Sequence, residues 1–386
     1  MNRTIYLIAM LLTLTMNVYG QSFEELYQEG QKYYNSKNYT KALECFSQAA
    51  AGGYEEARVQ IGLMYYSGWG VEKNYRTALN YLTISADNGH TFACSIVGGM
   101  YLVGKGISKD YNKAYKYLQK AAEQGNGLAL YYLGDMYYNG QGVQRDMKQA
   151  YNYYKQAVDH QYDNAKFDLG KMYFYGDGVN KNYVTAFNYL KPFADNDNGE
   201  AQCLIGTMYI GGKGVAQDDQ KAYLYLKKSA DNGFQYANYF LGLMYYSEQN
   251  YGKAFDYLKP FADNDEPDAQ FYVGLMYYTG NGVVQDYFNA INYFQKSTNN
   301  GNRDSQTLLG CCYYDGQGVT KNTSLGKKYL AKSAEQGDKN AQQILEEIET
   351  EELKGKTYKA IDKVAGYIPY FGVGWNIGKA ILELTH

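Results

Sequence analysis

A glycine recurs along this chain at almost constant spacing, and this repeat limits the fold more than any other feature. Seven of these glycines have an alanine five residues before them, seven have a methionine two residues after them, and all nine have a tyrosine three residues after them. A period in this range is typical of arrays in which each repeat is one small supersecondary unit that stacks on its neighbours. The steps are 32 or 36 residues, and the series is Gly30, Gly62, Gly98, Gly134, Gly170, Gly206, Gly242, Gly274 and Gly310.

Each repeat predicts two helices. In the first, helix A, the repeated alanine, leucine and tyrosine are four residues apart and share one face. The second, helix B, follows another alanine series that runs from Ala42 to Ala290. Glycine inside a helix costs about 1 kcal/mol relative to alanine, so the recurring glycine indicates that two helices approach closely. Pro192 and Pro260 fall inside B helices, where proline is expected to kink or shorten the helix.

A Gly-x-Gly segment such as Gly140–Gly142 follows helix A in seven repeats. A phosphate-binding loop would occur once, after a strand and before a helix. The repetition after a helix favours a turn instead, in which glycine ends helix A in a left-handed conformation. The two repeats with a 32-residue step lack this loop by four residues.

The motif A-x-x-x-L-G-x-M-Y-x-x-G-x-G-V, followed by an alanine-containing second helix, resembles the Sel-1-like repeat. The segment Leu133–Ala157 is a close match, and the resemblance covers roughly residues 24–350. It implies an all-α, right-handed superhelical solenoid of antiparallel helix pairs, related to tetratricopeptide repeats. We therefore expect about nine repeats in residues 21–353, closed by a capping helix in which Glu346 occupies the glycine position.

The resemblance also implies a non-catalytic scaffold or adaptor for a protein or peptide partner. By analogy with tetratricopeptide repeats, the partner would lie on the concave helix-A face, opposite the repeated alanine, leucine and tyrosine. Tyrosine and phenylalanine dominate the positions predicted there, and such rings suit an extended peptide or a partner helix. These positions hold Tyr66, Tyr131, Asp135, Tyr138, Phe167, Lys171, Phe174, Tyr239, Leu243, Tyr246, Phe271, Leu275, Tyr278 and Tyr314.

Two other roles for these rings stay open at the sequence level. They could pack between adjacent A helices and have no binding role, or they could stack on sugars as the site of a glycan-binding protein or envelope enzyme. Rings that bind a protein or a sugar must be exposed to solvent, whereas rings that pack between helices are buried. The fold therefore decides between these roles.

Both ends of the chain differ from the repeats. Residues 1–20 combine Arg3, a short apolar stretch and small residues before Gln21, which predicts a cleavable secretory signal. The chain is therefore expected outside the cytoplasm, in a bacterial envelope or secreted, with the lumen of the endoplasmic reticulum as the alternative. The tail 354–386 is apolar and glycine-rich, and it either caps the last repeat, associates with itself, or contacts a membrane or a partner through residues 364–384. The alternative function is therefore a membrane-associated effector that acts through this tail.

Composition excludes several classes of function. A formal net charge of −3 gives no basic field for nucleic acid. The three histidines have no ligand spacing, so no metal or cofactor is expected. The five cysteines do not follow the repeat, whereas some secreted members of the resembling family carry a regular cysteine pair and have been assigned penicillin-binding or β-lactamase activity. We therefore predict that this chain is not an enzyme.

Overall fold

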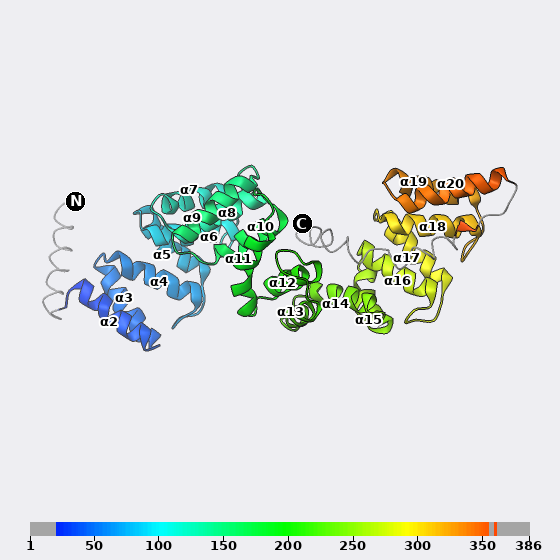
Figure 1. Cartoon of the computed structure of the whole chain (residues 1–386). Coiled ribbons are helices and arrows are strands. Elements are labelled where there is room, and N and C mark those ends of the chain that lie inside the picture. The colour runs from blue at the N-terminus through cyan, green and yellow to red at the C-terminus, as the bar shows by residue number, and fades with distance from the viewer. Residues whose placement is uncertain (1–20, 355–358, 361–386) are drawn as a thin grey trace. The chain divides into compact units, whose positions relative to one another are not determined.

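The computed structural model describes residues 21–354 and 359–360, and every regular element among them is a helix (Figure 1). The chain divides into two compact units, residues 1–181 and residues 182–386. The nineteen helices are nine repeats of helix A and helix B, followed by a single helix, α20. The predicted all-α repeat solenoid of nine repeats with a terminal helix is thus confirmed.

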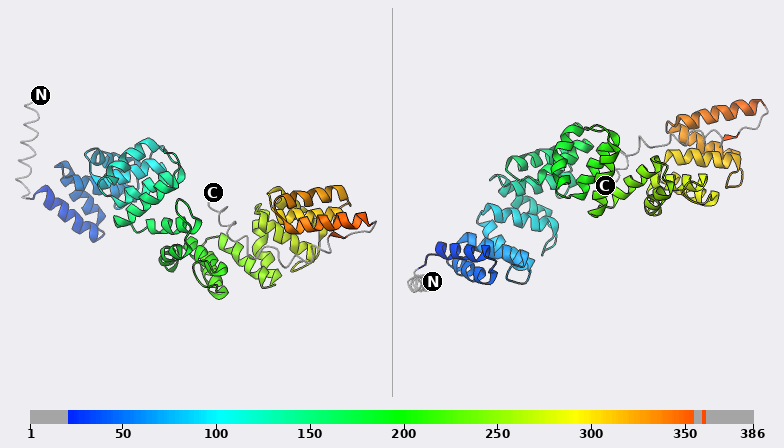
Figure 2. Two further views of the ribbon diagram at one scale, coloured as in Figure 1. Left: turned by 45° about the horizontal axis from the view of Figure 1, so that its top comes forward. Right: turned by 60° about the horizontal axis from the view of Figure 1, so that its bottom comes forward.

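Unit 1 contains nine of the helices. In chain order they are α2 (Phe23–Asn35), α3 (Tyr39–Ala51), α4 (Glu55–Ser67), α5 (Tyr75–Asp87), α6 (Thr91–Val103), α7 (Tyr111–Ala122), α8 (Gly127–Asn139), α9 (Met147–Asp159) and α10 (Ala165–Tyr175). In the first four repeats the two helices of a repeat pack against each other, as α2 and α3 show in Figure 2.

Unit 2 contains the other ten helices and is built in the same way. They are α11 (Tyr183–Asp195), α12 (Gly199–Gly211), α13 (Asp219–Asp231), α14 (Tyr236–Ser247), α15 (Tyr251–Asp263), α16 (Pro267–Thr279), α17 (Tyr287–Asn299), α18 (Arg303–Asp315), α19 (Thr323–Glu335) and α20 (Lys339–Leu353).

The glycine of helix A lies where helix B comes closest. A Cβ at Gly98 would lie 2.6 Å from Leu118 Cγ and 3.2 Å from the Ala114 carbonyl oxygen. A Cβ at Gly62 would likewise lie 2.6 Å from Leu82 Cγ in the preceding repeat. No side chain fits in this space, so close helix approach explains why the helix tolerates glycine.

The Gly-x-Gly loop has two distinct tasks. Its first glycine ends helix A in the left-handed region, as Gly104 does with φ +76°. Its second glycine passes so close to the preceding B helix that a Cβ at Gly142 would lie 2.5 Å from Tyr111 Cβ. Farther along, an Asn or Asp side chain caps the next B helix by accepting backbone N–H bonds. These N-caps are Asn74, Asp110, Asp146, Asn182, Asp218, Asp286 and Asn322.

A left-handed residue also joins each B helix to the next A helix. Glycine occupies this position in most repeats, for example Gly89 with φ +90°, but Gln161 occupies it at φ +63°. We expect Gln161→Gly to raise the free energy of unfolding of unit 1 by about 1 kcal/mol, because glycine removes the strain of a left-handed side chain. Urea unfolding measures this change. Gln161→Ala is the control, and an equal gain in that variant would contradict the explanation.

The two helix prolines do not shorten their helices, so the expectation of shorter helices was wrong, while a kink stays a prediction. Helices α11 and α15 each have 13 residues, as the proline-free α13 does. Pro192 and Pro260 lie near the ends of their helices, and their carbonyls still accept bonds from Asn196 N–H and Asn264 N–H. Each proline therefore removes one bond near the helix end without ending the helix early.

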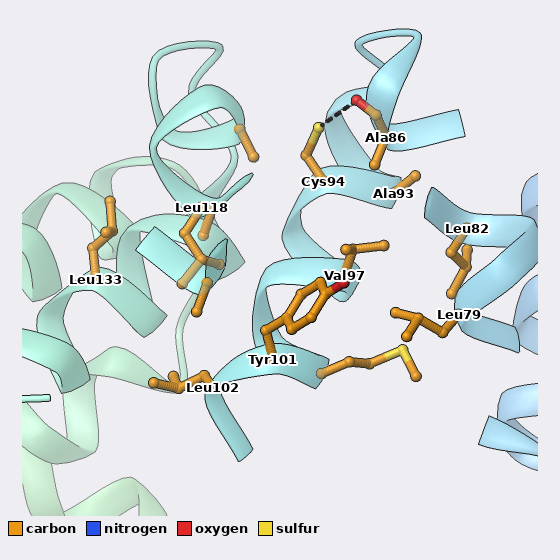
Figure 3. Packing of buried hydrophobic residues seen from close by; sticks show 14 of the residues in the cluster. Leu79, Leu82, Ala86, Ala93, Cys94, Val97, Tyr101, Leu102, Leu118 and Leu133 are labelled. Atoms are coloured by element: carbon orange, nitrogen blue, oxygen red, sulfur yellow. Dashed lines mark hydrogen bonds between the residues drawn. The ribbon is translucent and has the colours of Figure 1, made fainter. Parts of the chain in front are cut away.

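The core lies between A and B helices. In Figure 3, Val97 and Tyr101 of α6 lie between Leu79 and Leu82 of α5 on one side and Leu118 of α7 on the other. The helix-A tyrosine stacks on the helix-B tyrosine in six repeats, with ring centroids 5.4–6.2 Å apart and interplanar angles of 2–16°. These tyrosine pairs belong to the packing of the repeat itself.

The terminal helix α20 packs on α19 through Ala341, Ile344 and Ile348, which are fully buried. Glu346 occupies the glycine position and is exposed. The described residues contain no helix that is long and apolar enough to cross a membrane. The predicted signal at 1–20 and the apolar segment 364–384 lie outside the described residues.

Candidate partner-binding face

The positions predicted to form one open face differ between the two units. In unit 2, Tyr239, Phe271, Leu275, Tyr278 and Tyr314 are at most 7% exposed. Leu243 and Tyr246 are half-buried. The prediction of an open helix-A surface is therefore corrected for most of unit 2.

The physical reason is that these A helices are covered on all sides. Eight consecutive residues are buried in each of α12, α16 and α18, for example Ala269–Met276. A helix that is apolar all round is a buried helix. The ring of Tyr246 in α14 lies 4.8 Å from that of Tyr272 in α16, so aromatic side chains here fill the space between neighbouring repeats.

In unit 1, most of the predicted positions remain partly accessible. Phe174 is buried at 4% exposure. The other six predicted residues are half-buried, and we call them the unit-1 face: Tyr66, Tyr131, Asp135, Tyr138, Phe167 and Lys171. They come from the A helices α4, α8 and α10.

A buried tyrosine that the sequence analysis did not single out anchors this face. Tyr154 of α9 is 2% exposed, and its hydroxyl donates a 2.8 Å hydrogen bond to Asp135 Oδ1. Burial raises the pKa of the Asp135 carboxyl to about 7, and the nearby Asp168 charge adds to the rise. The signal was present in the repeat, because the corresponding residues are all Leu or Phe: Phe46, Leu82, Leu118, Leu190, Leu226, Leu258, Phe294 and Leu330.

A second carboxylate on α10 lies beside the first. Lys171 Nζ is 4.0 Å from Asp168 Oδ1 and 5.1 Å from the centre of the Phe167 ring. Burial, together with the charges of both carboxylates, raises the pKa of the Tyr131 hydroxyl on α8 well above the usual value. Helices α8 and α10 thus share a network of aromatic rings, two carboxylates and one ammonium group.

The loops after helix A complete the face. The Tyr138 hydroxyl donates a 3.2 Å bond to Asp177 in the following repeat's Gly-x-Gly loop, and burial raises its pKa to about 12. In the Gly-x-Gly loop that follows α6, the middle residue is Lys105. Its Nζ donates a 3.1 Å hydrogen bond to the hydroxyl of Tyr66 in the preceding repeat. In these two loops the middle residue therefore sets the charge beside the preceding repeat's tyrosine.

Other chemistry has little support in the described part of the chain. Its residues contain no group of three or more His, Cys, Asp or Glu side chains able to hold a metal ion. All five cysteines lie there without a disulfide, and four of them are buried. Burial raises the pKa of Cys203 and Cys311, which disfavours their reactive thiolate forms.

Comparisons with known proteins agree with the repeat geometry. A family profile described as Sel1 repeat matches nine consecutive segments that together span residues 15–338. A solved structure of a protective antigen present in uropathogenic Escherichia coli strains, described as displaying an SLR fold, is 27% identical with a TM-score of 0.63. The match covers 87% of this chain and 81% of that one.

A second solved structure, a Sel1 repeat protein from Oxalobacter formigenes, is 33% identical. The match covers 54% of this chain and 85% of that one, with a TM-score of 0.46. No curated protein sequence matches the chain significantly.

Proposed function

Since this chain belongs to the Sel1 repeat family, we propose that it is a non-catalytic scaffold that binds a protein or peptide partner on the unit-1 face. Repeats of this family generally serve protein–protein interaction. The observation that carries the proposal is the contrast between the units. In unit 2, most side chains at the predicted positions are buried. In unit 1, the aromatic and charged side chains at these positions stay partly accessible to solvent.

The chemistry of the unit-1 face suits a protein ligand. Tyr131, Tyr138 and Phe167 offer ring area that a partner can bury at low cost in side-chain entropy, since aromatic side chains have few rotatable bonds. Asp135 and Lys171 place one acidic and one basic group among these rings, and such groups fix the register of a partner more than they add affinity. We further propose that the chain meets this partner outside the cytoplasm, after export through residues 1–20.

Replacing Tyr131, Tyr138 and Phe167 together with alanine should abolish capture of the partner, because interface energy concentrates in buried aromatic anchors. The measurement is cross-linking and affinity purification of the tagged protein from its own host. The same sample reports the N-terminal residue, which is Gln21 if the signal is removed as predicted.

The matched control changes three partly exposed apolar residues of unit 1 that lie off this face. Phe92, Ile84 and Val103 are 40%, 51% and 52% exposed. Their alanine variant should retain the partner, and both variants should keep the helical circular dichroism of the parent. A partner that remains bound to the triple aromatic variant would rule out the unit-1 face as the contact surface.

A further inference from the structure

One repeat of unit 1 replaces an apolar core position with a buried polar pair. Tyr154 stands where every other repeat has Leu or Phe, and its hydroxyl bonds to Asp135. A buried polar or charged pair is rarely more stable than well-packed apolar residues of similar volume. The other repeats of this chain serve as internal controls, since they stack through apolar residues at that position.

We propose that Asp135, Tyr154 and Asp168 form a proton-linked switch that sets how tightly α8, α9 and α10 hold together. The inference concerns unit 1 itself and stands whether or not a partner binds there.

The groups that act on the Asp135 carboxylate come from each neighbouring helix. Tyr154 of α9 donates a hydrogen bond to it, Asp168 of α10 repels its charge, and Lys171 of α10 attracts it. On α8 itself, Tyr131 and Tyr132 lie within its electrostatic influence.

From α6, the residue that approaches this site is Gly99, which contacts the ring of Tyr132 and carries no charge. A Cβ at Gly99 would lie 2.8 Å from the Tyr132 ring, so α6 brings its backbone close and adds no charge at this point. The network thus brings two carboxylates and one ammonium group together beside the buried Tyr154 hydroxyl.

The two protonation states therefore differ in packing energy. With Asp135 neutral, the repulsion from Asp168 disappears and the carboxyl still bonds to Tyr154. With Asp135 charged, desolvation and repulsion weaken the contact between α8 and α10. Helix α10 is suited to respond, because it is the shortest helix of unit 1, at 11 residues, and begins without a side-chain N-cap.

The direction of the pH effect follows from linkage. The folded chain ionises Asp135 near pH 7, whereas the usual value for aspartate is 3.8. The folded state therefore holds this proton more tightly than the unfolded state. The stabilising contribution is fully present below about pH 4, is lost progressively as the pH rises toward about 7, and is absent above that value.

Hydrogen exchange of the full chain at several pH values between 5.5 and 8 tests the switch. After correction for intrinsic exchange rates, the opening constants of peptides from α8 and α10 should rise at least about tenfold across this range, since one pKa unit corresponds to a factor of ten. Peptides from α4, in the same unit, should not change. This comparison within the wild-type protein needs no variant.

Two variants sharpen the test. Asp135→Asn stays neutral and keeps an acceptor for Tyr154, so the pH dependence of α8 and α10 should vanish. Asp87→Asn is the matched control, because Asp87 also accepts a tyrosine hydroxyl, from Tyr117 at 2.7 Å, but is exposed. That variant should keep the wild-type pH dependence. Wild-type exchange that is flat with pH, or a dependence that survives in Asp135→Asn, would overturn the proposal.

Discussion

Replacing Gly282 with alanine is expected to destabilise unit 2 by about 3–5 kcal/mol, which combines the cost of a left-handed alanine with that of overpacking. Gly282 has φ +74°, and a Cβ there would lie 2.5 Å from the Tyr251 carbonyl carbon and 2.7 Å from Gly252 N. These are backbone atoms of the preceding B helix, so no rotamer change can relieve the clash. The stacking of two repeats must give way instead.

The other glycine of the same loop is the matched control. Gly280 has nearly the same φ, +73°, but its Cβ would lie 3.2 Å from Gln285 Cβ and no closer than 3.6 Å to a backbone atom. Gly280→Ala should therefore cost only about 1–2 kcal/mol, the price of a left-handed alanine. Urea unfolding followed by circular dichroism measures both, and hydrogen exchange shows which unit has opened. Equal losses in the two variants would show that backbone conformation alone, without repeat contact, explains the glycines.

Most of the fold could be predicted because a repeat states its pattern many times. A single glycine inside a helix is ambiguous. The same glycine at Gly62 and Gly98, each five residues after a repeated alanine, indicates a close helix contact. The left-handed Gly-x-Gly turns were predicted for the same reason. The effect of Pro192 was not, because a proline near a helix end removes one hydrogen bond where the helix is about to finish.

The candidate face was harder to predict, since a helical wheel gives direction and not exposure. The wheel placed Phe271 and Tyr131 at equivalent positions opposite the repeated alanine. In the structure Phe271 is 1% exposed and Tyr131 is half-buried, because what lies over each position depends on the neighbouring repeats. The role of Tyr154 could not be predicted from the repeat pattern, because it depends on a residue that departs from that pattern.

Because Tyr154 replaces the usual Leu or Phe, we expect a single and a double substitution to change the free energy of unfolding of unit 1 in opposite directions at pH 8. Tyr154→Leu alone should destabilise unit 1 by about 2–4 kcal/mol, because the charged Asp135 loses its hydrogen-bond donor in a half-buried place. Combining it with Asp135→Leu should make unit 1 about 1–4 kcal/mol more stable than the wild type, as replacement of a buried pair by apolar residues often does.

The chain itself shows that leucine fits both positions. A Cβ built at Gly62, Gly98 or Gly134 would lie at the same 2.6 Å from Leu82, Leu118 or the Tyr154 ring, so leucine and tyrosine occupy equivalent space. Leu275 fills the position of Asp135 in another repeat. Urea unfolding of the two single variants, the double variant and the wild type gives the coupling energy between the sites. Additive effects would mean that the pair does not act as one unit. A double variant more stable than the wild type would mean instead that unit 1 gives up stability to keep a carboxylate on this face, which is the pattern expected where a residue is retained for binding or regulation and not for folding.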